Sequence, residues 1–82
     1  MPDQDPETLK AHSEVAIGSL ARDMEVYRER GGSPPESALH EAGVLHDRAK
    51  EAGLNETAER LMSAIQTAMR EIRKLGGDWR ER

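Results

Sequence analysis

His12, His40 and His46 are the side chains of this sequence best suited to acid–base chemistry near neutral pH. A nucleophilic site would set a serine, cysteine or threonine beside a histidine and an orienting acid, and none of these histidines stands in such a motif. His40 and Glu41 begin like the zinc-binding sequence of metalloproteases, but the next histidine, His46, lies about 240° further around a helix. One helix therefore cannot present both imidazoles to one metal ion, and we expect no catalytic residue, no metal site and no cofactor.

Residues 31–36 read Gly-Gly-Ser-Pro-Pro-Glu, which has the glycine content of a phosphate-binding loop. Such a loop follows a strand and offers free amides at the start of a helix, whereas no strand is expected here and the two prolines lack N–H groups. As a boundary between helices, Gly31 ends the first helix, and Ser33 with Glu36 forms a capping box around the prolines of the second. The stretch therefore predicts a stiff chain reversal between two helices.

The rest of the chain has the composition of an all-α protein, because good helix formers are abundant and β-branched and aromatic residues are sparse. The pattern predicts three helices at about residues 6–30, 34–52 and 56–75. Short connections make sequence neighbours antiparallel, so we expect a small antiparallel three-helix arrangement in one domain over residues 1–82.

Residues with capping preferences mark the predicted helix ends. Asp5 stands before a proline and is typical of an N-cap. Gly53 and the leucine after it have the form of a Schellman ending, and Asn55 then caps the third helix. We expect residues 1–5 and 76–82 to be flexible tails.

Apolar residues repeat at helical spacing in all three segments. The third helix has the widest stripe, formed by Ala58, Leu61, Met62, Ile65, Ala68, Met69, Ile72 and Leu75. The first helix has a stripe of Leu9, Ala16, Leu20, Met24 and Tyr27, with Ile17 at its margin. The second helix has a mostly alanine stripe of Ala38, Ala42, Leu45, Ala49 and Ala52. The predicted core is therefore short of large side chains.

A small core needs support, and the absence of cysteine excludes disulfides as its source. Val15 and Val26 fall together on a second, weaker apolar side of the 6–30 helix, and Gly18 lies near the first of them. Glycine inside a helix costs about 1 kcal/mol relative to alanine, so its presence suggests that another backbone approaches there. We expect a homodimer formed through this side or through an extension of the main stripes.

The charge balance limits the possible partners. The chain has 12 basic and 16 acidic residues, a net charge of -4, which is the wrong sign for a strongly basic DNA-binding protein. The first ten residues carry acids where a secretory signal would carry bases, and no apolar run approaches the ~20 residues of a membrane span. We expect a cytoplasmic protein without a membrane partner.

Nucleic-acid binding is the alternative hypothesis. Within residues 49–62, Ala49 and Gly53 have the spacing of the small residue and the turn glycine of a helix-turn-helix. The helix that follows opens Asn-Glu-Thr-Ala-Glu-Arg, whose two acids would face phosphates. The stretch from Gln66 to Arg82 is the more basic feature, with five basic residues against three acidic ones.

These observations favour a non-enzymatic protein-binding module: a small dimeric regulator, inhibitor or adaptor that occludes a surface of its partner. Antitoxins, immunity proteins and phage or plasmid regulators are of this kind, and a bacterial or phage source is expected. A structural or assembly component is a third hypothesis. The candidate interaction residues are Val15, Gly18, Val26, Arg70, Arg73, Lys74, Trp79 and Arg80.

Trp79 has two possible roles that fluorescence separates, because it is the one tryptophan of the chain. If Trp79 folds back over Leu75 and Ile72, its emission in the free protein is blue-shifted. If Trp79 is an interface residue awaiting a partner, its emission lies near that of exposed indole.

Overall fold

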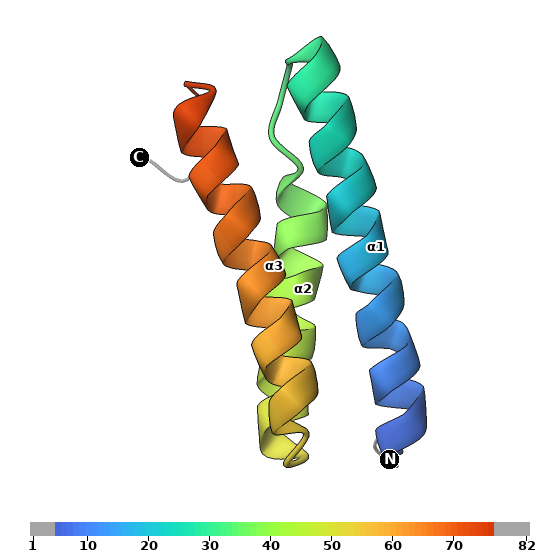
Figure 1. The fold of residues 1–82 in the computed structure, drawn as a ribbon. Helices are drawn as coiled ribbons and strands as arrows, with labels where there is room; N and C mark the ends of the chain where they lie inside the picture. The colour runs from blue at the N-terminus through green and yellow to red at the C-terminus, as the bar shows by residue number, and fades with distance from the viewer. Residues whose placement is uncertain (1–4, 77–82) are drawn as a thin grey trace.

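The computed structural model describes residues 5–76, which form three helices, α1 (Pro6–Arg30), α2 (Glu36–Glu51) and α3 (Asn55–Lys74). In Figure 1, α1 and α3 run in the same direction and α2 runs antiparallel to both. α2 packs extensively against each of its neighbours, whereas α1 and α3 contact each other least. The predicted three-helix arrangement, with sequence neighbours antiparallel, is therefore confirmed.

The length of α1 sets the long dimension of the molecule. Its 25 residues extend about 37 Å at 1.5 Å per residue, and the molecule measures 39 × 23 × 23 Å. α2 has only 16 residues, and the connection over residues 31–35 descends from the end of α1 before α2 begins (Figure 1). Pro34 and Pro35 in this connection are half-buried, and Tyr27 near the end of α1 is buried.

The N-terminal cap of α1 is as predicted. The backbone N–H of Thr8 donates to Oδ1 of Asp5 at 2.9 Å, and Pro6 follows as the first helical residue. This hydrogen bond lowers the pKa of the Asp5 carboxyl, because the charged carboxylate is the better acceptor. Asp5 is therefore part of the end of α1, as its predicted role as N-cap requires.

The predicted capping box at the start of α2 was wrong. α2 begins at Glu36, two residues later than predicted, Pro35 is its N-cap, and no side chain makes a capping hydrogen bond there. A residue that precedes proline is disfavoured in the helical conformation, so Pro34 is held outside the helix by Pro35. The N–H of Glu36 instead donates to the carbonyl of Pro34 at 2.8 Å. Ser33 is consequently too far from the first helical turn to cap it.

The connection between α2 and α3 is the predicted Schellman motif. The N–H of Leu54 donates to the carbonyl of Ala49 at 2.8 Å, and the N–H of Gly53 donates to that of Lys50 at 3.1 Å. Gly53 has a φ of 80°, which favours glycine. The N-cap of α3 is Leu54 and Asn55 is already helical, so the prediction of an Asn55 cap was wrong by one position.

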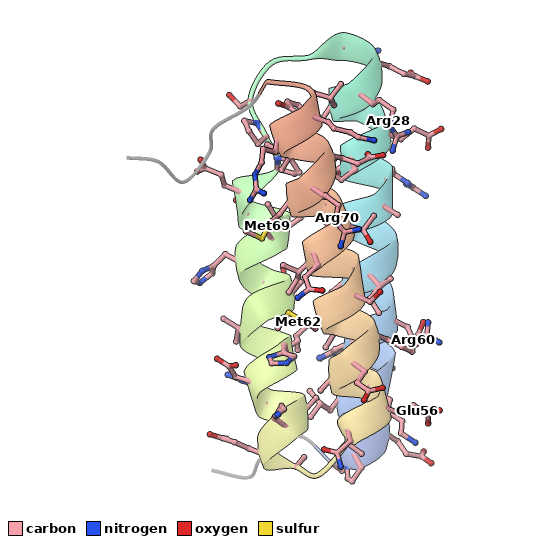
Figure 2. The ribbon with its side chains drawn as sticks, turned by 60° about the vertical axis from the view of Figure 1, so that its left-hand side comes forward. Arg28, Glu56, Arg60, Met62, Met69 and Arg70 are labelled. Atoms are coloured by element: carbon pink, nitrogen blue, oxygen red, sulfur yellow. The ribbon has the colours of Figure 1, made fainter. Side chains whose placement is uncertain are left out.

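Small side chains make up much of the core within residues 5–76. Its buried apolar members are Leu9, Ala16, Leu20, Met24, Tyr27, Leu39, Ala42, Leu45, Ala49, Ala58, Leu61, Ala68 and Ile72. The prediction placed Ala52 and Leu75 in the apolar stripes as well, but both are exposed because they are the C-caps of α2 and α3. Met62 and Met69 are half-buried and lie between α3 and α2 (Figure 2).

Ser13 is the buried polar residue that the apolar pattern did not predict. Its side chain is fully buried, and its hydroxyl donates to the carbonyl of Leu9 at 2.8 Å. Because the hydroxyl finds an acceptor one turn back on its own helix, burial leaves no unpaired polar group. Ser13 thus serves as another small residue in the α1 stripe.

The tight fit around α2 generates a stability prediction. Ala49 is fully buried, so Ala49→Leu should lower the free energy of unfolding by about 1–3 kcal/mol although leucine is more apolar. The matched control is Ala11→Leu at an exposed position of α1, which should change stability by no more than about 0.5 kcal/mol. Urea denaturation of both variants measures the difference. Stabilisation by Ala49→Leu would show that the core has unfilled space there.

The Asp5 cap generates a pH prediction. The folded state lowers the pKa of Asp5, so its stabilising effect is present at neutral pH and is lost as the pH falls through the folded-state pKa. Asparagine also caps helices but does not titrate. We expect the melting temperature of wild type to exceed that of Asp5→Asn at neutral pH, with the difference vanishing in acid. If the difference in melting temperature is the same at every pH, the charge of Asp5 does not contribute to the stability of the cap.

Candidate functional site

A groove of about 420 Å³ lies between α1 and α3, where the two parallel helices contact each other least. Small side chains such as Ala21, Ala64 and Ala68 leave this space unfilled, and Ile17 is only half-buried beside them. The residues that line the groove are Ile17, Leu20, Ala21, Met24, Arg28, Arg60, Ser63, Ala64, Thr67, Ala68 and Glu71. The α1–α3 face is therefore apolar at its centre and open to solvent.

Two ion pairs cross this face between the helices, one toward each end of the groove. Nη2 of Arg60 lies 2.8 Å from Oε1 of Glu14, and Nη2 of Arg28 lies 2.9 Å from Oε1 of Glu71. Figure 2 shows Arg28 and Arg60 on the same side of the molecule, toward opposite ends. The hydrogen bond to Glu71 raises the pKa of Arg28 above its usual value. Because all four side chains remain partly exposed, these pairs contribute little to stability.

The predicted interaction residues of α1 lie outside the groove. Val15 is 67% exposed and Val26 is 48% exposed. A Cβ atom added to Gly18 would meet nothing within 4 Å, so no other part of the described chain approaches this glycine. The exposed Arg22 lies between the two valines along the helix, which divides the strip.

A shallow surface between α1 and α2 includes one of these valines. Val15 borders one hollow and Val44 borders another, and the two hollows share Ser37 and Glu41. Acidic side chains interrupt the apolar area, so this surface is less continuous than the groove.

The predicted basic residues lie at the end of α3. Arg70, Arg73 and Lys74 are exposed on its last turns, and Figure 2 shows where Arg70 projects. Trp79 and Arg80 lie outside the described residues. The valines lie on α1 and these three bases lie on α3, and none of them lines the groove.

The geometry of α2 and α3 bears on the helix-turn-helix alternative. Both views show these helices side by side and antiparallel, whereas the two helices of a helix-turn-helix cross at about 90–120°. Residues 49–62 therefore have the spacing of that motif without its arrangement.

Nδ1 of His46 lies 3.2 Å from Oδ1 of Asp47, while His12 and His40 lie on exposed surfaces. Within residues 5–76, no three potential metal ligands are grouped closely enough to hold an ion. None of the helices in this part of the chain is both long and apolar enough to cross a membrane.

Sequence reasoning did not predict the groove or its ion pairs. The predicted apolar stripe of α3 included Ala68 but not Ala64. Whether these small residues leave space depends on how far apart α1 and α3 lie. The pairing of Glu14 with Arg60 depends on the level at which the two helices meet. The small residues Ala21 and Ala64 were the available signal.

Comparisons with known proteins found no matching family model, no matching curated protein and no matching solved structure. Function must therefore be argued from the chain's own geometry.

Proposed function

We propose that this protein is a binding module that holds an amphipathic helix of a partner protein in the α1–α3 groove. The groove supports this proposal, because its floor is apolar, its walls have small side chains and it opens to solvent. Grooves of this kind accept the apolar face of a helix. In this proposal the chain catalyses no reaction, and it regulates, inhibits or adapts its target by covering a surface of it.

The parallel course of α1 and α3 favours a particular orientation of the bound helix. α2 runs antiparallel to both α1 and α3 and packs against one side of them (Figure 1). A partner helix in the groove would pack against their other side, and an antiparallel course would give it the same direction as α2. The result is a four-helix bundle, in which each helix is antiparallel to its neighbours across the groove. Ala21, Ser63 and Ala64 are small enough for the added helix to approach closely.

Nucleic-acid binding through Arg70, Arg73 and Lys74 is the alternative proposal. The exposure of these three bases at the end of α3 supports it. A salt-sensitive mobility shift of DNA or RNA at micromolar protein would favour this alternative.

Site-specific crosslinking in a lysate of the native host tests the proposed function. A photoreactive residue at Thr67, on the wall of the groove, should crosslink a protein other than this chain. The matched position is Val44, which is exposed on α2 and should give no such product. Adding Ala21→Arg, which places a long charged side chain in the groove, should lower the yield about tenfold. Equal crosslinking from positions 67 and 44, or a yield that Ala21→Arg leaves unchanged, would contradict the proposal.

A further inference from the structure

The two ion pairs of the α1–α3 face have opposite polarity. At the end nearer the N-termini of both helices, α1 contributes the acid Glu14 and α3 the base Arg60. At the other end, α1 contributes the base Arg28 and α3 the acid Glu71. Consider a two-fold axis that lies in the plane of this face and runs perpendicular to the helices. Rotation about it stacks α1 on α1 and α3 on α3 of a second molecule with their ends exchanged. Each charge then meets its opposite in the second molecule.

One axis satisfies both helices. Glu14 and Arg28 are equidistant in sequence from Ala21, and Arg60 and Glu71 are equidistant from the bond between residues 65 and 66. Because the ion pairs join these residues across the face, Ala21 and the middle of α3 lie at the same level. Glu14 would then meet Arg28 of the second copy, and Arg60 would meet its Glu71.

Four of the five remaining charges of α3 follow the same symmetry, and Arg70 is the exception. Glu56 and Lys74 are equidistant in sequence from residue 65, and Glu59 and Arg73 are equidistant from residue 66. Both centres lie within one residue of the bond between residues 65 and 66. All four side chains are exposed. Helical spacing also places each pair on the same edge of α3, as an antiparallel contact of two identical helices requires.

The centre of the face suits close contact between copies. α3 carries no charge between Arg60 and Arg70. Its groove side there consists of Ser63, Ala64, Thr67 and Ala68. The molecule measures 39 × 23 × 23 Å, so the outline of one long side is large enough to hold the roughly 800 Å² that each partner contributes to a standard interface. Five of the buried core residues are alanines, so the single chain has further apolar burial to gain from such contact.

We propose that a second copy of this chain packs antiparallel on the α1–α3 face, with the two-fold axis passing beside Ala21. The inference goes beyond the proposed function, because the second copy covers the same groove whether or not a foreign partner binds there. A partner helix and the second copy then compete for one surface.

Two double variants test the dimer and its orientation by sedimentation equilibrium. Glu14→Arg with Arg60→Glu reverses one ion pair, and Arg28→Glu with Glu71→Arg reverses the other. Each keeps its intrachain attraction and the net charge, but each sets like charges together across the two-fold axis. We expect wild type to be a dimer, and each double variant to raise the dissociation constant about 100-fold.

An equimolar mixture of the two double variants should dimerise again, because each end of one variant then meets opposite charges on the other. The chain with all four substitutions should dimerise for the same reason. The matched control exchanges the exposed charges Glu41 and Arg48 on α2 and should leave the dimer unchanged. Circular dichroism verifies that every variant is folded.

Three outcomes would overturn the proposal. In the first, wild type is a monomer. In the second, the double variants still dimerise, which a parallel contact of the two copies predicts. In the third, the equimolar mixture of the double variants stays monomeric. The result is separable from the proposed function. If wild type is a monomer but Thr67 still crosslinks a foreign protein, the dimer is contradicted and the proposed function is supported. If Thr67 crosslinks only this chain, the proposed function is contradicted and the dimer is supported.

Discussion

α2 packs closely against both of its neighbours, and this contact sets where α1 and α3 lie. Ala42 and Ala49 are fully buried on α2, and Ala58 and Ala68 are buried on α3. Small side chains let helix backbones come together, but each buries little apolar area. The chain therefore gains its tightest packing along α2. The contact between α1 and α3 is left incomplete, and the groove lies there.

The ion pairs across the groove hold α1 and α3 at a defined level without closing the space between them. Long side chains reach over the small residues, so Arg28 and Arg60 span a gap that Ala21 and Ala64 leave open. Solvated pairs of this type add specificity more than stability. A face that is apolar in the middle and has ordered charges at both ends can distinguish one orientation of a bound helix from the other.

Sequence patterns predicted the helices because each pattern reports on residues within one element. The stripe of α3 and the Schellman glycine Gly53 are local signals. Both predictions hold, except that Leu75 at the end of the stripe is exposed. The predicted start of α2 was wrong because two local preferences conflict there. Ser33 favours a cap, but Pro35 disfavours the helical conformation at Pro34, so the helix begins only at Glu36. The groove could not be predicted, since it depends on the spacing and level of α1 against α3, which no single-helix pattern contains.

The unequal connections have a consequence for how the native state opens. Gly53 joins α2 to α3 in a minimal turn, so this hairpin forms with little loss of chain entropy. α1 is joined through the longer segment over residues 31–35, and it contacts α3 least. Opening of the bundle should therefore begin with release of α1 as one cooperative unit while the α2–α3 hairpin persists. Since α1 forms one wall of the groove, hydrogen exchange of its amides would report at once on local unfolding and on the lifetime of the binding surface.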